Sequence, residues 1–170
     1  VLQRKVLSLA AEHRRPVIVA TEMLHSMVTS TRPTRAEASD VATAIYDGAD
    51  ATMLSGETAS GAHPTIAVTM MARIIHAAEQ SSWWKPEGPA ANAPPVPFSE
   101  AIARAAVRTA KDVGARLIAV FTQSGDTARL ISKERPSVPI VAFSPSEHIR
   151  RRLGLYWGVT PRVMSPLRDT

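Results

Sequence analysis

The stretch Val-Ile-Val-Ala-Thr-Glu-Met-Leu, residues 17–24, decides how the fold is interpreted. Its first four residues are apolar and mostly β-branched, which is typical of a short strand buried in a parallel sheet. Thr21 and Glu22 then place a hydroxyl and a carboxylate directly after that strand. Because functional groups in α/β sheets gather beyond the carboxyl ends of the strands, these two residues mark a candidate site.

Helical patterns alternate with short strands over the first half of the chain. Apolar residues recur at helical spacing over 1–13, and a second buried strand is predicted at 51–54. Thr34 and Glu37 form a Thr-x-x-Glu capping box that predicts a helix start, and Gly48 suits the left-handed conformation that ends such a helix. The buried face of the next helix is expected to consist of Ile66, Met70 and Ile74.

A proline-rich stretch, 82–98, separates the two halves and is predicted to be a linker, because proline disrupts both helix interiors and central strands. Ser99 is expected to cap a helix that runs to Val113. Further strands and helices are predicted at 117–121, 127–134, 140–143, 147–153 and 159–164. The alternation indicates an α/β fold with parallel sheets, divided into 1–81, the linker and 99–170.

Composition bounds the function classes. Of the 170 residues, 45% are hydrophobic and 21% charged, which is ordinary for a globular protein. The absence of cysteine excludes disulfides and thiolate catalysis and is compatible with the cytoplasm. No apolar run approaches the roughly 18 residues that a membrane span needs, so no membrane role is expected. The net charge of +5 is concentrated in the second half, which indicates either an ordinary solvated surface or a surface that meets an acidic or phosphorylated ligand.

Polar residues also follow the second predicted strand, as Ser55, Glu57 and Thr58. The carboxyl ends of neighbouring parallel strands meet at one edge, so these side chains are expected near Thr21. An alternative is that Thr21, Glu57 and Thr58 only cap the helices that follow. Two strands alone do not form a stable sheet. We therefore expect that further strands precede residue 1 and that the second domain is truncated at its end.

These motifs resemble the pyruvate kinase family. The resemblance lies in the segments 16–24, 32–37 and 47–59, and in Thr-Gln-Ser-Gly at 122–125 with Pro-Ile-Val-Ala at 139–142. It implies the last two strand-helix units of a (β/α)8 barrel and most of an α/β C-terminal domain with a mainly parallel sheet. It also implies phosphoryl transfer from phosphoenolpyruvate to ADP, giving pyruvate and ATP in glycolysis.

The resemblance implies that Mg2+ and K+ assist the reaction, while the family's catalytic lysine and metal ligands would lie outside this chain. The isolated chain is therefore expected to be inactive, and a homotetramer is implied for the complete protein. By resemblance, Thr21 contacts the substrate on the side from which the proton is delivered. Ser55 and Glu57 would line the same opening of the barrel, at the carboxyl ends of the strands. Arg32 and Arg35 match a subunit-interface loop, with ordinary surface solvation as the alternative.

The turn at 122–127 is rich in hydroxyl and amide groups and precedes a helix, so it can cradle a phosphate. In the family this turn belongs to an effector site for a sugar phosphate or nucleotide. The residues assigned to it are Thr122, Gln123, Ser124, Gly125 and Thr127. Simple helix capping is the alternative, and the carboxylate of Asp126 would repel an anionic effector.

Two other functions remain open at this point. The chain could be a non-catalytic sugar-phosphate or nucleotide-binding regulatory module derived from the family, acting through its basic half. A nucleic-acid binder is the weakest hypothesis, because the basic residues are not interleaved with aromatic residues and form no known binding motif.

Overall fold

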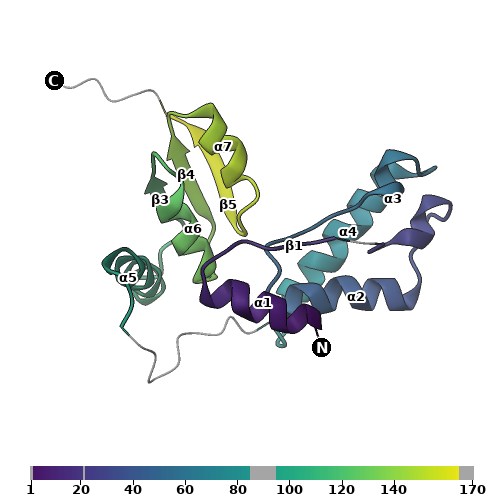
Figure 1. Cartoon of the computed structure of the whole chain (residues 1–170), viewed down its shortest axis with the longest axis horizontal. Helices are drawn as coiled ribbons and strands as arrows, with labels where there is room; N and C mark the ends of the chain where they lie inside the picture. The colour runs from purple at the N-terminus through teal and green to yellow at the C-terminus, as the bar shows by residue number, and fades with distance from the viewer. Residues whose placement is uncertain (1, 21, 85–94, 165–170) are drawn as a thin grey trace. The chain divides into compact units, whose positions relative to one another are not determined.

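The computed structural model describes residues 2–20, 22–84 and 95–164 of the chain. It divides the chain into two compact units, 1–85 and 86–170 (Figure 1). Both units contain helices and parallel strands, as the sequence predicts. Residues 85–94 of the expected linker lie outside the described residues.

The first unit contains a pair of short parallel strands with helices packed around them. Its elements are α1 (Leu2–Glu12), β1 (Ile18–Val19), the 3-10 helix η1 (His25–Val28), α2 (Arg35–Tyr46), β2 (Ala51–Thr52), α3 (Gly56–Ala59) and α4 (Pro64–Glu79). Ile18 pairs with Ala51 in parallel register, and the amide of Met53 donates to the carbonyl of Val19 at 2.9 Å. The carboxyl ends of β1 and β2 therefore lie side by side.

The two strands are less buried than the sequence predicts. Ile18 is 46% exposed, and both residues of β2 are half-buried. Within the described residues each strand has only the other as a neighbour, so one edge and part of each face stay uncovered. The prediction of fully buried strands at 17–20 and 51–54 is wrong for this chain.

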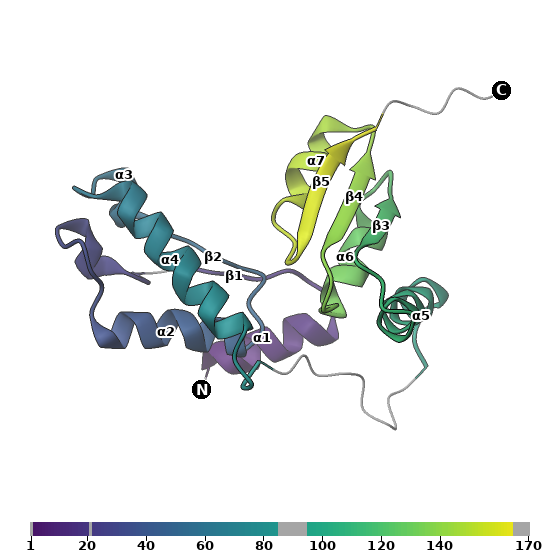
Figure 2. The same ribbon diagram turned by 180° about the vertical axis from the view of Figure 1, so that it is seen from behind.

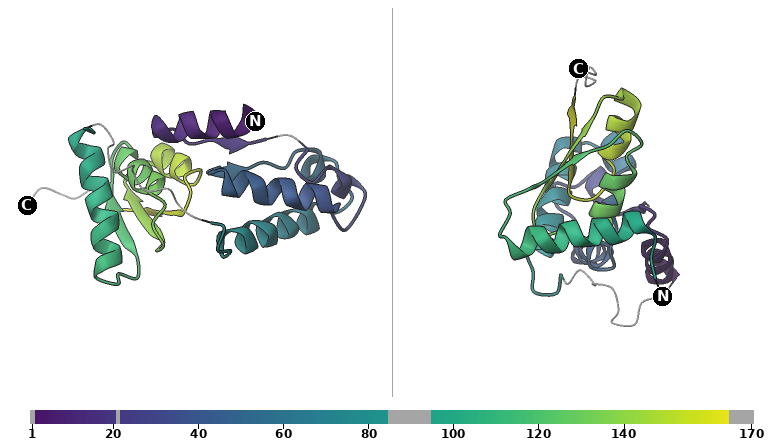
Figure 3. Two further views of the ribbon diagram at one scale, coloured as in Figure 1. Left: turned by 90° about the horizontal axis from the view of Figure 1, so that it is seen from below. Right: turned by 90° about the vertical axis from the view of Figure 1, so that its left-hand side faces the viewer.

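Helix α2 confirms the predicted capping box. The hydroxyl of Thr34 accepts from the amide of Glu37, and the Glu37 carboxylate accepts from the amide of Thr34. Val41, Ala44 and Ile45 face the core, and Gly48 has a φ of +92° after the helix end. Helix α2 packs against α4 (Figure 3).

The buried face of α4 differs from the predicted one. Its buried residues are Ala67, Met71 and Ala78, whereas Ile66 is 41% exposed. Met70 and Ile74 are only partly buried at the margin of the core. The buried face of α4 is thus offset by about one residue from the positions that carry the largest side chains. Small alanines on this face allow α4 and α2 to approach closely.

The second unit is a three-stranded parallel sheet with helices on one face. Its elements are α5 (Phe98–Asp112), β3 (Ile118–Phe121), α6 (Asp126–Lys133), β4 (Ile140–Ser144), α7 (Glu147–Leu153) and β5 (Val159–Val163). The strand order is β3-β4-β5. Both α6 and α7 lie on the same side of the sheet (Figure 2). On the other side, Phe121 stacks on Phe143 with ring centroids 5.2 Å apart.

Helix α5 starts earlier than predicted. Pro97 occupies the N-cap position, and no side chain caps the helix, so the prediction that Ser99 is the cap is wrong. The fixed φ of proline suits the entry into a helix and moves the start by two residues. Among the described residues, no helix combines the length and apolar character that a membrane crossing requires.

Candidate active site at two strand ends

Glu57 joins the segments that follow the two strands of the first unit. Its Oε1 accepts a hydrogen bond from the amide of Leu24 at 3.0 Å, and its Oε2 accepts one from the amide of Ser55 at 2.8 Å. The side chain is 1% exposed. Burial raises the pKa of Glu57, but hydrogen bonds from main-chain amides, together with the nearby His25, lower it below its ordinary value. The carboxylate therefore stays ionised, and its two hydrogen bonds connect the ends of the two strands.

The segment after β1 is anchored by its apolar side chains. Met23, Leu24 and Met27 are buried in the core of the first unit. Glu22 is exposed and has a φ of +41°, a conformation that non-glycine residues rarely adopt. The predicted catalytic residue Thr21 lies outside the described residues. Its described neighbours, Ala20 and Glu22, belong to the region where Glu57 connects the two strand ends.

Ser55 and Thr58 stand at the end of β2. Ser55 is the N-cap residue of α3, but its side chain makes no capping hydrogen bond and is exposed. The Thr58 hydroxyl donates to the carbonyl of Ser55 at 3.3 Å within α3, so Thr58 caps neither α3 nor α4 with its side chain. Of the two, Ser55 presents its hydroxyl to the solvent at the strand end.

Glu37 has a second set of partners that the capping box did not predict. Its carboxylate also accepts from the amide and the hydroxyl of Ser26, at 2.7 and 2.5 Å. Burial raises the pKa of Glu37, but the hydrogen bonds from Ser26 and Thr34 outweigh this and lower it to about 2. The sequence offers a signal for the Thr34 contact only, because the Ser26 contact depends on the path of the loop. Arg32, just before α2, and Arg35, its first residue, are exposed.

In the second unit, the hydroxyls of the predicted phosphate turn have internal partners. Thr122 Oγ1 accepts from the amide of Gly125 at 2.8 Å, and the Ser124 hydroxyl donates to the carboxylate of Asp126 at 2.9 Å. The hydrogen bond from Ser124 contributes most to lowering the pKa of Asp126, burial opposes it, and the guanidinium groups of Arg129 and Arg152 also lower it. Gln123 and Thr127 are exposed.

Arg152 was not predicted to belong to this turn, and the structure brings it there. Its guanidinium donates to the carbonyl of Ser124. Gly125 has a φ of +88°, and a Cβ there would lie 3.2 Å from the Arg152 Nη2. This contact connects α7 to the turn, and the two segments come together only in the folded sheet.

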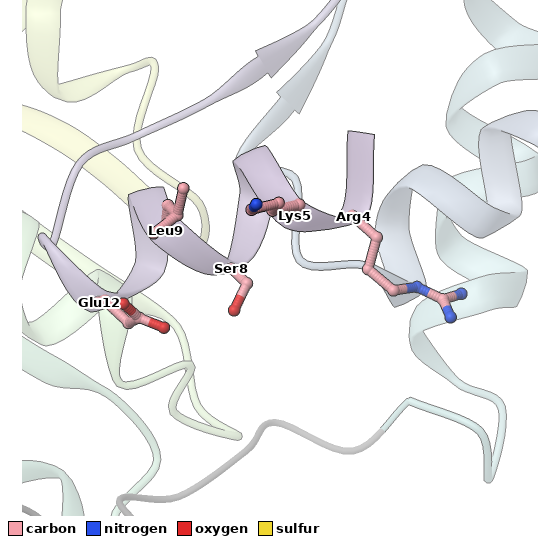
Figure 4. A pocket seen from close by; sticks show the side chains of 5 residues that line it. All are labelled: Arg4, Lys5, Ser8, Leu9 and Glu12. Carbon is pink, nitrogen blue, oxygen red and sulfur yellow. The ribbon is translucent and has the colours of Figure 1, made fainter. Parts of the chain in front are cut away.

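One surface hollow lies away from the strand ends, along α1. It has a volume of about 490 Å³ and is lined along α1 by Arg4, Lys5, Ser8, Leu9 and Glu12 (Figure 4). Within the described ranges, no group of three His, Cys, Asp or Glu residues could hold a metal ion.

A parallel strand pair with polar groups at its carboxyl ends, followed by a separate parallel α/β unit, defines part of a (β/α)8-barrel protein with an added α/β domain. Family models assign the two parts. Residues 1–68 match "Pyruvate kinase, barrel domain", and residues 100–170 match "Pyruvate kinase, alpha/beta domain". The chain belongs to the pyruvate kinase family.

Similar proteins agree with this assignment. The chain is 49% identical over 162 residues to a pyruvate kinase of Agrobacterium vitis, covering 92% of this chain and 33% of that protein. It is 41% identical over 174 residues to a pyruvate kinase of Mycobacterium tuberculosis, covering 99% of this chain and 35% of that protein. A crystal structure of a Cryptosporidium parvum pyruvate kinase superposes with a TM-score of 0.87 at 43% identity, covering 95% of this chain and 33% of that one. The chain thus spans about a third of the length of these relatives.

Proposed function

We propose that this chain supplies two strand-helix units of the catalytic barrel and part of the C-terminal domain of a pyruvate kinase. The complete protein would transfer the phosphoryl group of phosphoenolpyruvate to ADP, giving pyruvate and ATP in glycolysis in the cytoplasm. One observation carries the proposal: Glu57 ties together the segments after two neighbouring parallel strands, where a barrel enzyme has its active site. We place the boundary between the two domains within 82–98.

Each residue of the strand ends has a proposed role. The hydroxyl of Thr21 contacts the substrate and relays a proton towards the enolpyruvate, since a hydroxyl both donates and accepts. Ser55 lines the same mouth with its exposed side chain. Glu57 acts by positioning, because both of its carboxylate oxygens already accept main-chain hydrogen bonds. The Mg2+ and K+ that the family implies are not assigned to residues of this chain, and no step above depends on them.

The isolated chain is expected to be inactive, because phosphoryl transfer depends on cationic groups that neutralise the transferred phosphoryl group. Of its four lysines, none follows a strand into a carboxylate as the family's catalytic lysine does. We propose that Arg32 and Arg35, both exposed at the start of α2, belong to a subunit interface of a homotetramer.

A phosphorylated effector is proposed to bind at the turn 122–127 of the second unit. The supporting features are the N-terminus of α6 and the guanidinium groups of Arg129 and Arg152 beside it. The carboxylate of Asp126 opposes this binding, since it already pairs with Arg129 at 3.3 Å. An effector phosphate would have to displace it, so we expect weak binding.

A fusion protein tests the catalytic proposal. The chain is joined to the part of the Agrobacterium vitis pyruvate kinase that it does not cover, and pyruvate formation from phosphoenolpyruvate and ADP is measured. Turnover by the fusion, together with none by the 170-residue chain alone, supports the proposal. A folded fusion without turnover contradicts it, and so does turnover by the chain alone. The regulatory-module alternative predicts that folded but inactive fusion.

A further inference from the structure

The carboxylate of Glu37 collects four hydrogen bonds at the start of α2. Its Oε1 accepts from the amide of Ser26 at 2.7 Å. Its Oε2 accepts from the Ser26 hydroxyl at 2.5 Å, from the amide of Thr34 at 2.7 Å and from the Thr34 hydroxyl at 2.9 Å. A helix cap requires only the Thr34 contacts, so the two contacts to Ser26 need a separate explanation.

Ser26 belongs to η1, in the middle of the long connection between β1 and α2. This connection begins at the strand end that carries the candidate site. It is fixed near its start by the bond from the Leu24 amide to Glu57, and two residues later by the bonds from Ser26 to Glu37. Two carboxylates from two later elements therefore hold alternate residues of one segment.

We propose that Glu37 is a positioning residue for the reaction, which fixes η1 to the start of α2 and thereby sets the place of the strand-end segment from Glu22 onwards. This inference rests on the proposed function, because it gives Glu37 an effect on turnover that passes through Thr21. Glu37 itself is not expected to contact the substrate.

The ionised carboxylate is necessary for this role, and glutamine cannot replace it. All four partners of Glu37 are donors, and three of them converge on Oε2. A glutamine that places its oxygen at Oε2 must direct its NH2 group at the amide of Ser26, so that two donors face each other. The opposite rotamer directs the NH2 group at the amide of Thr34, which is also a donor. Glu37→Gln therefore disturbs the loop, although the two side chains have almost the same shape.

The first experiment measures amide hydrogen exchange in the 170-residue chain. In Glu37→Gln, a peptide spanning 24–34 is expected to exchange about tenfold faster, since its local opening becomes easier. A peptide from α4 should be unchanged. Ser26→Ala, which removes one hydroxyl and keeps the amide contact, should have a smaller effect on the same peptide. Glu12→Gln removes an exposed carboxylate from α1 and serves as the matched control.

The second experiment measures kinetics in the fusion protein. Glu37→Gln should lower kcat about tenfold or more, because small displacements of reacting groups are costly. KM should change less than threefold, and Glu37→Asp should restore part of kcat.

Unchanged hydrogen exchange at 24–34 in Glu37→Gln overturns the proposal. Faster exchange there with unchanged kcat per folded molecule also overturns it. An inactive wild-type fusion overturns the proposed function and with it the effect on turnover. The exchange measured in the 170-residue chain then still decides whether Glu37 holds the loop, so the two failures can be told apart.

Discussion

The amide of Leu24 donates to the carboxylate of Glu57 at 3.0 Å, across 33 residues of chain. Leu24 follows β1, and Glu57 lies in α3 just after β2. The bond therefore connects two strand-end segments directly rather than through the sheet. Because the side chain of Leu24 is fully buried in the core, this one residue links the hydrophobic packing to the polar strand ends.

Glu57→Gln should destabilise the first unit. Both oxygens of Glu57 accept main-chain amides, and glutamine has only one acceptor oxygen, so one buried amide loses its partner. The expected loss is about 1–3 kcal/mol in the free energy of unfolding. Urea titration of the 170-residue chain at pH 7 measures it. Thr58→Ser, which keeps the local hydroxyl contact, is the control. Equal stability of Glu57→Gln and wild type would contradict the role of Glu57 in connecting the two strand ends.

The stability contributed by Glu37 should depend on pH in the acid range. Its pKa in the folded protein is about 2, below its ordinary value of 4.5. The carboxylate therefore stabilises the fold fully above pH 4.5, and this contribution is lost as the pH falls towards 2. The difference in unfolding free energy between wild type and Glu37→Gln should shrink over this window. A difference that stays constant from pH 7 to pH 2.5 would show that the ionised form is not responsible.

Asp126→Asn should strengthen phosphate binding at the turn before α6. The substitution removes the negative charge that pairs with Arg129 and faces any bound anion. Affinity for inorganic phosphate should rise by about fivefold, which corresponds to roughly 1 kcal/mol at a helix N-terminus. Calorimetry on the 170-residue chain measures it. Asp112→Asn breaks a comparable pair with Arg108 on α5 and should leave phosphate affinity unchanged. An equal rise in both variants would indicate an effect of net charge alone.

Thr21→Val in the fusion protein should lower turnover much more than stability. Valine has nearly the shape of threonine and lacks the hydroxyl proposed to relay a proton, a contribution of about 10²–10⁴-fold in general acid–base catalysis. Steady-state kinetics and thermal unfolding of the same preparation separate the two effects. Loss of folding with normal turnover per folded molecule would favour the capping alternative instead.

The sequence predicted those features that depend on local contacts. The capping box of Thr34 and Glu37 and the helix at 147–153 agree with the structure, because each is determined within a few residues. The alternation of helices and strands correctly indicated parallel sheets in both units. Segments 16–24 and 47–59 were specific enough to indicate the family, and the family models agree.

Features that depend on distant contacts were missed or wrong. The contact between Ser26 and Glu37 and the approach of Arg152 to Ser124 join elements whose proximity appears only after folding. Ile66 was predicted to be buried from its size, but the packing of α4 on α2 selects the smaller Ala67. For the candidate site, the sequence pattern located the two strand ends. It gave no indication that both carboxylate oxygens of Glu57 would accept hydrogen bonds from main-chain amides.

The connection after β1 is held by hydrogen bonds from the amides of Leu24 and Ser26 and by the buried side chains of Met23, Leu24 and Met27. Its path is therefore independent of the exposed side chains of Glu22 and His25. Substitution at these two positions can alter the charge at the mouth while the backbone keeps its course. The fold thus keeps the contacts that hold this loop apart from the exposed charges that it presents.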